Sequence, residues 1–596
     1  MPEASYEAAS RSRFRPAGAA DVADDEPKLR LLLAAFGAVF VLIALNLIWL
    51  QVVDASNLAR RAEDRRTNVV TLNAKRGTIY DRNGNVLAIS VDCKDVVCDP
   101  TVLQKTVKDE NGKTSKTSDG AAEDIADVLV EVLAGDRDTY LEALKRENTR
   151  YAYLARRVDV SQADAIEQKL EERGLSGVYY ETDTKRVYPY GTTAAQILGY
   201  VNQDGAALSG LEYYYDDILR GEDGQRVYEA SGNGMPIAGG VSDTIAARNG
   251  TDIVLSIDID LQDECEKIIS EAAKTYEAES GSVMVTNPKT GEVYAAASTP
   301  LPDFSNITDA SSLNLKLVTD SYEPGSVFKV LTTAIGIEDG LFTKDSTFTI
   351  PAEILVGDSY VHDDDGRDYE LDMSVDYALA QSSNVAMAYY VQNIIGAKRF
   401  ADGVEKFGIG QKTGIDFPGE ATGIVKSYND YDGSTAGSMA FGQGLAIPLV
   451  QIVRAYGAVA NDGVPTTPHF LVSKAGEEVE WPAGERIISK KTADEETNMM
   501  RSVMLDGSGA LGQVEGYDIA GKTGTGEQAD EQGGYKENHF VASLCGFANA
   551  DDPEVLVYAG LNGIPYLAAV SAANVFHDVM QQSVTILGVA PAATSN

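Results

Sequence analysis

The pattern of apolar and polar positions divides the chain into a spanning segment followed by mixed helices and strands. Residues 31–50 read LLLAAFGAVFVLIALNLIWL, without a charged residue. A helix of that length spans roughly 30 Å, the thickness of a bilayer's hydrocarbon core. A cleavable signal peptide would have a shorter apolar region and a small-residue cleavage site, so we expect an uncleaved membrane anchor. Basic residues flank both ends, so the positive-inside rule favours a cytoplasmic N-terminus only weakly.

The elements after this anchor predict a first domain rich in strands. Residues 51–75 indicate a juxtamembrane helix that leads into a strand, and Asn83-Gly84 lies between two apolar runs, a pattern typical of a β-hairpin. Residues 104–120 are polar and indicate an exposed excursion. Helical periodicity follows over residues 121–147 and 161–173. We therefore expect an extended α+β pedestal domain that contains many strands.

A polar stretch with an Asn-Gly turn places the next domain boundary near residue 248. Beyond it the pattern predicts a helix over 261–278, strands over 281–286 and 292–298, and later strands near 516–523 and 540–547. This order favours an α+β domain with helices packed on an antiparallel sheet. The predicted organisation is a polar, disordered N-terminal tail (1–27, within a cytoplasmic segment 1–30), the anchor (31–50), the pedestal (51–247) and a second folded domain (248–596).

Composition and charge leave the predicted elements unchanged and exclude some classes of function. The 596 residues carry a formal net charge of −40, which argues against nucleic acid because polyphosphate binding needs clustered Lys and Arg. The four histidines are scattered and no Cys/His spacing fits a metal, so we expect neither a metal site nor a cofactor. Cys93 and Cys98 are close enough in sequence to pair if the domain is exported, whereas Cys265 and Cys545 are expected to be buried thiols.

The first candidate for chemistry is Ser326-Val327-Phe328-Lys329, the only Ser-x-x-Lys in the chain. Pro324-Gly325 precedes it and an apolar run follows, which predicts a helix that begins at or near Ser326. Residues i and i+3 share a helical face, so the Lys329 amine can reach the Ser326 hydroxyl and serve as its base. Taken alone, the pattern more often marks an N-cap serine with a solvated lysine.

Two further motifs follow in order. Ser382-Ser383-Asn384, about 50 residues later, is a polar triplet between two helical runs, although Ser-x-Asn also occurs at Ser231, Ser312 and Ser427. Lys522-Thr523-Gly524-Thr525 comes at the end of an apolar run that predicts a strand. There the lysine supplies positive charge, the hydroxyls can bind a carboxylate, and the glycine allows a close backbone approach.

Lys412-Thr413-Gly414 repeats the letters of the last motif in a loop rich in glycine and proline. No clear strand precedes it. We expect this copy to be a loop remote from the site, with its lysine charge in water.

Ser-x-x-Lys, Ser-x-Asn and Lys-Thr-Gly in this order resemble the signature set of penicillin-binding proteins and class A β-lactamases. Other stretches are similar to the class B penicillin-binding proteins: RGTIYDRNG at 76–84, RVYPYGTTAAQILGYVN at 186–202 and GLEYYYDDILRGEDG at 210–224 resemble their three pedestal motifs. FGIGQKTGIDFPGE and MAFGQGLAIPLV are similar to their transpeptidase domain. The resemblance covers residues 70–580 and includes nothing like a glycosyltransferase domain.

This resemblance implies a serine transpeptidase that cross-links cell-wall peptides and binds penicillins covalently. Ser326 would attack the penultimate D-alanine carbonyl of a donor stem peptide while Lys329 takes its proton. Ser382 would relay a proton to the leaving amine, and Asn384 would hold the donor amide. The backbone amides of Ser326 and Thr525 would form the oxyanion hole. The implied site residues are Ser326, Lys329, Ser382, Asn384 and Lys522, with Thr523, Gly524 and Thr525 binding substrate.

The resemblance also implies a place and partners: a single-pass cell-membrane protein with its catalytic domain outside, a membrane glycan polymerase beside it, and a septal role in the divisome rather than an elongation role. Two alternatives stay open on sequence alone. A D,D-carboxypeptidase or β-lactamase would send water to the acyl-enzyme, and a penicillin receptor or scaffold would not turn over. The anchor and the long pedestal count against the first, and the single predicted span counts against the second.

Overall fold

The computed structural model describes residues 26–57, 67–108, 111–229, 242–303, 310–529, 534–566 and 569–592. The predicted tail up to residue 25, most of the predicted juxtamembrane helix (58–66) and the triplet at Ser231 lie outside these ranges. The chain forms two compact units, one of residues 1–72 with 223–247 and one of residues 73–222 with 248–596.

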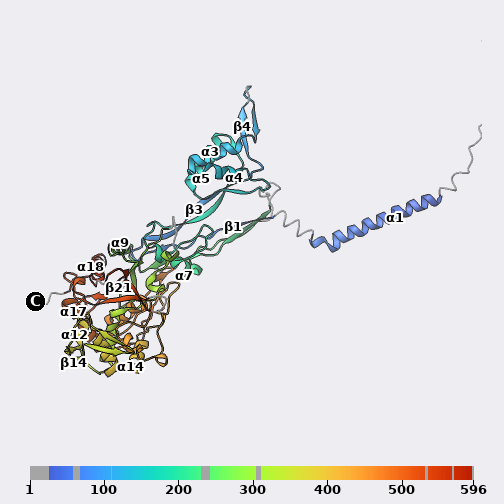
Figure 1. Cartoon of the computed structure of the whole chain (residues 1–596). Helices are drawn as coiled ribbons and strands as arrows, with labels where there is room; N and C mark the ends of the chain where they lie inside the picture. The colour runs from blue at the N-terminus through green and yellow to red at the C-terminus, as the bar shows by residue number, and fades with distance from the viewer. Residues whose placement is uncertain are drawn as a thin grey trace, which may run out of the picture. The chain divides into compact units, whose positions relative to one another are not determined.

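The first unit contains the predicted anchor. Helix α1 (Glu26–Ile48) continues into a single π turn, η1 (Trp49–Val53), and Figure 1 shows α1 as one uninterrupted helix. Residues 27–53 have a mean hydropathy of 2.7 in their most apolar window, so this helix is long and apolar enough to cross a membrane. The unit also holds an antiparallel sheet in the order β1-β9-β10, with β1 at Thr67–Leu72, β9 at Gly224–Glu229 and β10 at Ser242–Ile245.

The second unit begins with the predicted hairpin. Strands β2 (Ile79–Tyr80) and β3 (Val86–Cys98) are joined by a turn in which Gly84 has a φ of +83°, the left-handed conformation that an Asn-Gly turn supplies. They belong to a seven-stranded sheet in the order β19-β18-β11-β2-β3-β6, with β8 paired on β3. The other strands are β6 (Ala152–Asp159), β8 (Val178–Val187), β11 (Ile253–Leu255), β18 (Leu471–Lys474) and β19 (Glu477–Glu478). This sheet therefore crosses the predicted boundary at residue 248.

The helical pattern over 121–147 forms two helices. Helix α3 (Ala121–Leu133) ends before Gly135, and α4 (Arg137–Leu144) begins where the Asp136 carboxylate accepts a hydrogen bond from the Thr139 N–H. Both helices, with α5 (Val160–Glu172), bury apolar side chains in one core with β3 and β6. The polar excursion over 104–120 contains an exposed hairpin, β4 (Gln104–Lys108) and β5 (Thr114–Thr117), next to β7 (Leu175–Ser176).

Cys93 and Cys98 do not pair: both are free, buried thiols in β3, so the disulfide that their closeness in sequence left open does not form. Five residues of extended strand separate their Cα atoms by about 16 Å and turn their side chains to opposite faces. A disulfide needs Cα atoms within about 7 Å. Cys265 and Cys545 are buried, as predicted.

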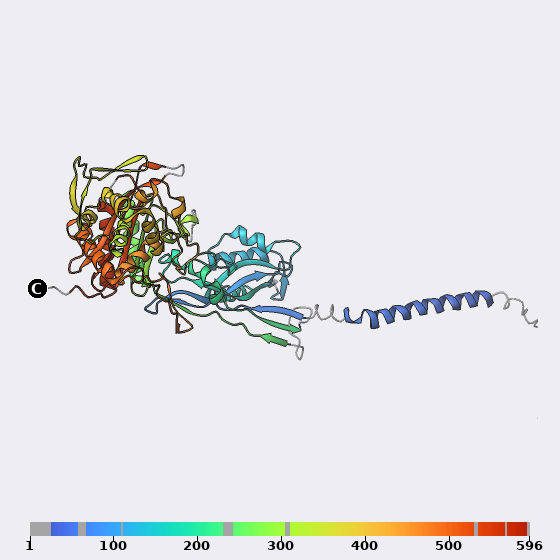
Figure 2. The same cartoon turned by 90° about the horizontal axis from the view of Figure 1, so that it is seen from below.

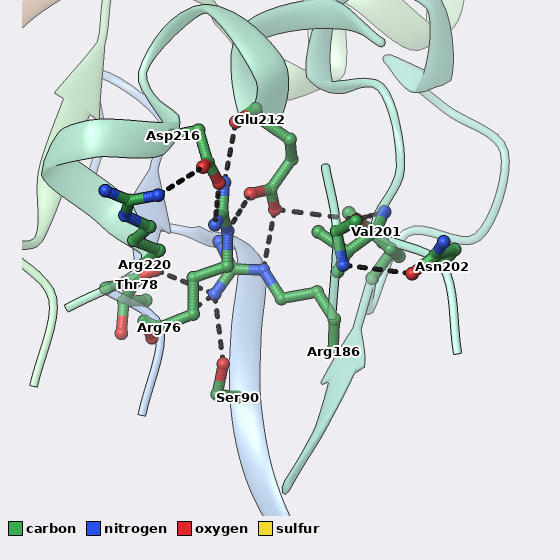
Figure 3. Close-up of polar contacts among 12 residues, drawn as sticks. Arg76, Thr78, Ser90, Arg186, Val201, Asn202, Glu212, Asp216 and Arg220 are labelled. Atoms are coloured by element: carbon green, nitrogen blue, oxygen red, sulfur yellow. Dashed lines mark hydrogen bonds and ion pairs between the residues drawn. The ribbon is translucent and has the colours of Figure 1, made fainter. Parts of the chain in front are cut away.

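The three motifs that resemble pedestal sequences meet in one buried ion network (Figure 3). Glu212, fully buried in α7 (Gly210–Tyr214), accepts from Arg76 Nε at 2.5 Å and from Arg186 Nε at 2.6 Å. Arg76 Nη1 also contacts Asp216 of α8 (Asp216–Leu219) at 2.5 Å. Arg186 Nη1 donates to the carbonyl of Gly77 at 2.7 Å. Residues more than 100 positions apart are thus held together by charge.

The remaining residues surround a five-stranded antiparallel sheet in the order β13-β12-β22-β21-β20. Its strands are β12 (Ser280–Thr286), β13 (Val293–Ser298), β20 (Ile519–Ala529), β21 (Tyr535–Ala548) and β22 (Val555–Ile564). Helices α9 (Ile259–Thr275) and α18 (Ala569–Ile586) share one apolar core with the sheet, and the helices of residues 310–506 form the other. Figures 1 and 2 show the red strands of this sheet enclosed by helices. The predicted α+β architecture is confirmed.

One further short helix, α6 (Ala195–Leu198), lies in the pedestal. The helices around the five-stranded sheet are η2 (Ala310–Leu313), α10 (Lys316–Thr319), η3 (Gly325–Phe328), α11 (Lys329–Glu338), α12 (Val375–Ala380), α13 (Asn384–Tyr390), η4 (Val391–Ile395), α14 (Ala397–Lys406), η5 (Tyr428–Asp430), α15 (Thr435–Met439), α16 (Leu449–Ala460), α17 (Lys490–Asp506) and η6 (Ala510–Gly512). Two small hairpin sheets pair β14 (Thr347–Ile350) with β17 (Leu371–Ser374) and β15 (Glu353–Val356) with β16 (Ser359–His362).

Candidate active site

Ser326 lies in a short 3₁₀ turn, η3, that runs directly into α11, so the helix predicted near Ser326 is present with a tighter first turn. The preceding Gly325 has a φ of +61°, and its N–H donates to the carbonyl of Gly442 at 3.1 Å. A Cβ there would be strained by the backbone and only 3.1 Å from the carbonyl oxygen of Thr525. Glycine therefore lets the serine turn pack against β20. Ser326 is buried, with 6% of its surface exposed.

The Lys522-Thr523-Gly524-Thr525 motif lies inside β20, whereas the apolar run predicted that the strand would end there. A Cβ on Gly524 would lie 2.4 Å from Ser543 Oγ and 3.1 Å from a methyl carbon of Val327. Only glycine leaves room for the serine turn at this point of the strand. Lys522 and Thr523 are buried.

The Ser382-Ser383-Asn384 triplet connects two helices, as predicted. Helix α12 ends at Ala380 and α13 begins at Asn384, with the hydroxyl of Ser383 accepting a hydrogen bond from the Ala386 N–H at 3.0 Å. Ser382 has a φ of +58°, an uncommon conformation for a residue other than glycine. Asn384 is half-buried.

The three motifs converge on the Ser382 hydroxyl. Its oxygen accepts from Lys329 Nζ at 3.1 Å and from Lys522 Nζ at 2.9 Å, and Lys329 also donates to the Ser382 carbonyl. Both lysines are fully buried. Lys522 donates in addition to the carbonyl of Thr523 at 2.9 Å. Among the described residues no hydrogen bond joins Ser326 to Lys329, so Ser382 rather than Ser326 holds the amine.

Burial is the main electrostatic influence on this pair. It lowers the pKa of Lys329 to about 7, and the carboxylates of Asp363 and Asp364 oppose that shift. Burial also lowers the pKa of Lys522 well below its usual range, with a smaller contribution from the neighbouring charge of Lys329. Two amines on one oxygen in a buried site cannot both stay charged at low cost. The arrangement therefore supplies a neutral amine near neutral pH, which an ordinary lysine does not.

The second Lys-Thr-Gly is a structural loop. Lys412 is exposed, as predicted, while the N–H and hydroxyl of Thr413 donate to Glu420 at 2.5 and 2.6 Å. Two residues after this motif, the buried Asp416 accepts from Tyr215 Oη at 2.6 Å. The loop thus makes contact with Tyr215, at the junction of α7 and α8, and no hydrogen bond among the described residues joins it to the three motifs.

Two residues near the site were not singled out from the sequence. Ser508 Oγ lies 2.5 Å from Thr523 Oγ1, and Asp363 contacts the Ser-x-Asn triplet from a loop 20 positions earlier. No local pattern marks either one. In the described ranges, no group of three His, Cys, Asp or Glu residues has a geometry that could hold a metal ion.

Comparison with known families matches two parts of the chain. Residues 281–581 match the penicillin binding protein transpeptidase domain, and residues 71–255 match the penicillin-binding protein dimerisation domain. The first match alone covers half of the chain.

Individual relatives extend over nearly the whole length. Penicillin-binding protein PbpB of Mycolicibacterium smegmatis is 32% identical over 91% of this chain and 87% of its own. Peptidoglycan D,D-transpeptidase FtsI of Escherichia coli is 29% identical over 91% of this chain and 89% of its own.

A solved structure from Atopobium parvulum, named as a peptidoglycan glycosyltransferase, is 46% identical with a TM-score of 0.68, covering 88% of this chain and 100% of that one. The family models that match this chain describe dimerisation and transpeptidase domains, so we do not assign the glycosyltransferase activity in that name to this chain.

Proposed function

Because this chain belongs to the class B penicillin-binding proteins and is a serine-type peptidoglycan D,D-transpeptidase, we propose that Ser326 is its nucleophile and that Lys329, Ser382, Asn384 and Lys522 complete the catalytic group. The observation that carries this proposal is the convergence of two buried lysines on Ser382 beside the serine turn. A serine becomes a good nucleophile only next to a base, and a lysine is a base only where its pKa is depressed.

Acylation follows from this arrangement. Neutral Lys329 takes the Ser326 proton as the serine oxygen attacks the penultimate D-alanine carbonyl of a donor stem peptide. The N–H groups of Ser326 and Thr525 stabilise the oxyanion. The carbon–nitrogen bond then breaks as Ser382 gives its proton to the departing amine and takes the proton that Lys329 holds, so that D-alanine leaves and Lys329 is neutral again. An amine of a neighbouring stem attacks the ester, the new amide forms, and Ser326 recovers its proton.

The remaining residues bind the donor. Lys522, Thr523 and Thr525 hold its terminal carboxylate, Gly524 admits its backbone, and Asn384 holds its amide. A carboxylate beside Lys522 would favour the charged form of that lysine. Its charge would in turn disfavour protonation of Lys329, so donor binding itself would prepare the base.

The apolar helix supports a place of action at the membrane. In this proposal residues 31–50 form the membrane span, residues 1–30 are cytoplasmic and the catalytic domain (248–596) lies outside the membrane. The pedestal (51–247) faces membrane partners, of which a glycan polymerase of the divisome is the expected one. The similarity to FtsI and PbpB favours cross-linking at the division septum.

The test uses a labelled penicillin on the full chain in detergent. We expect a single adduct, at Ser326, and no labelling of Ser326→Ala. Peptide mapping that places the adduct on another residue would refute the assignment of the nucleophile. Intact-mass time courses should show an adduct that persists, because a transpeptidase excludes the water that a β-lactamase directs at its ester. Release of D-alanine from a stem peptide, with amide formation to an added amine, completes the test.

A further inference from the structure

The loop that follows β16 contacts the Ser-x-Asn triplet directly. Asp363 Oδ2 accepts a hydrogen bond from Ser383 Oγ at 2.6 Å, and Asp363 Oδ1 accepts from the Val385 N–H at 3.0 Å. Ser383 Oγ in turn accepts from the Ala386 N–H at 3.0 Å. Asp363 therefore fixes the first turn of α13 and the side chain that caps it.

Asp363 is itself held by an arginine of the same loop. Arg367 Nη2 lies 2.9 Å from Asp363 Oδ2, and the two side chains are only 2% and 9% exposed. Arg367 Nη1 donates to the carbonyl of Ile350, at the end of β14, at 3.2 Å. A buried, paired carboxylate of this kind holds its position far better than an exposed one.

The position of Ser382 depends on its neighbour Ser383. Ser382 has a left-handed backbone, which is strained for a residue other than glycine and persists only where the surroundings impose it. On one side, the Ser382 N–H donates to Leu379 at 3.0 Å; on the other, the Ser383 N–H donates to Ala378 at 2.9 Å. The Asp363 contact adds the side-chain restraint, one residue from the oxygen on which the two lysines converge.

We propose that Asp363 is a positioning residue of the transpeptidase: by anchoring Ser383 it holds the Ser382 hydroxyl between Lys329 and Lys522. This inference rests on the proposed function, because it assumes that acylation runs through these three groups. Asp363 does not touch the reacting atoms.

Charge and position can be separated at this site. Asp363 and Asp364, both from this loop, raise the pKa of Lys329 against the larger effect of burial. The neighbouring cation is Lys522 of β20, whose own pKa is lowered by burial and by Lys329. Asp364 is exposed, and among the described residues no hydrogen bond joins it to the triplet. Asp364→Asn therefore removes a similar charge without removing the anchor and is the matched control.

The experiment measures second-order penicillin acylation rates of the detergent-solubilised full chain across a pH series. Asp363→Asn should lower the plateau rate by about a hundredfold, the scale of a catalytic group misplaced by about 1 Å. Asp364→Asn should leave the plateau within about threefold. In both variants the acidic limb should move to lower pH, because each loses a carboxylate that favours protonated Lys329.

Ser383→Ala serves as the second variant, because Asp363→Asn takes from the buried Arg367 the nearer of its two carboxylates and can destabilise the fold; the other carboxylate, of Asp365, lies 3.5 Å away. Ser383→Ala should lower the plateau, and adding Asp363→Asn to it should cost little more, since both changes break the same contact. A folded Asp363→Asn or Ser383→Ala with a wild-type plateau overturns the proposal, as does an equal loss in Asp364→Asn. A wild-type chain that is not acylated at Ser326 overturns the proposed function instead.

Discussion

At the scale of single residues, the site depends on two buried amines that share one hydroxyl oxygen. Asp363 and Asp364 favour the charged form of Lys329, whereas in the protein without substrate only hydrogen-bond acceptors of neutral groups contact Lys522 Nζ within the described residues. The resting positive charge is therefore better accommodated on Lys329. In the proposed mechanism a donor carboxylate would reverse that preference and so couple recognition of the substrate to activation of Ser326.

The pH dependence of acylation should follow Lys329. Its pKa is lowered to about 7, so the neutral base predominates above that pH and is lost as the pH falls. The acylation rate of the wild-type chain should thus fall about tenfold per pH unit below about pH 6 and level off above about pH 8. Stopped-flow or gel-based acylation rates across this range check it. A rate that keeps climbing toward pH 10 would mean that Lys329 titrates as an ordinary lysine.

The two Lys-Thr-Gly copies give a matched pair of substitutions. Lys522→Ala removes a buried amine from the Ser382 hydroxyl and should lower the acylation rate by about a hundredfold or more, the scale of losing one positioned electrostatic group. Lys412→Ala removes an exposed charge from a loop and should change the rate less than about threefold. Acylation rates are measured with thermal melts, so that unfolding is not mistaken for lost chemistry. A slow, folded Lys412→Ala beside a normal Lys522→Ala would reverse the assignment.

At the scale of elements, the buried network of Figure 3 joins β8, α7 and the segment before β2. Glu212→Gln leaves two buried arginines without their shared carboxylate and should lower the free energy of unfolding by about 3–5 kcal/mol. Glu222→Gln is the control, because Glu222 and its partner Arg248 are 75% and 81% exposed and 3.6 Å apart, and it should change stability by less than about 0.5 kcal/mol. Denaturant unfolding measures both. If both substitutions lowered the free energy of unfolding equally, the buried network would contribute no more to stability than the exposed ion pair.

Local pattern predicted the elements well and the contacts between them poorly. Apolar periodicity located α5 and α9, and Asn83-Gly84 located the β2–β3 turn, because each depends on residues a few positions apart. The order of the three motifs led to Ser382, but no sequence pattern indicated its φ of +58° or the hydrogen bonds that tie Ser382 and Ser383 back to the end of α12. The strand through Lys522 extends to Ala529 because β21 pairs with it, although the glycines at 524 and 526 argue locally against a strand.

The sequence alone could not predict the contacts between residues that lie far apart in the chain. Asp363 meets Ser383 across 20 positions, and Arg76 meets Glu212 across 136. The resemblance marked the segments that contain Arg76 and Glu212 but gave them no roles. For Asp363 there was no signal, since aspartates in a polar loop are ordinary surface residues.

At the scale of the whole molecule, the residues proposed for chemistry and those that position them all belong to the second compact unit. That unit contains residues 73–222 and 248–596, and the sheet that includes β2, β3 and β11 joins its two segments. The apolar helix belongs to the other unit. The helix proposed to anchor the protein and the residues proposed to catalyse the reaction therefore belong to different compact units of the chain.

Removal of residues 1–52 should consequently yield a soluble protein that is acylated at nearly the wild-type rate. The deletion takes away almost all of the apolar span (27–53) but keeps β1, β9 and β10, which pair with one another. The strongly negative charge of the chain favours solubility once the span is gone. Acylation rates of the shortened and full-length proteins, both checked by thermal melts, should agree within about threefold, the range for changes that leave the site intact. A shortened protein that unfolds cooperatively yet binds no penicillin would show that the helix contributes to the chemistry as well as to the location.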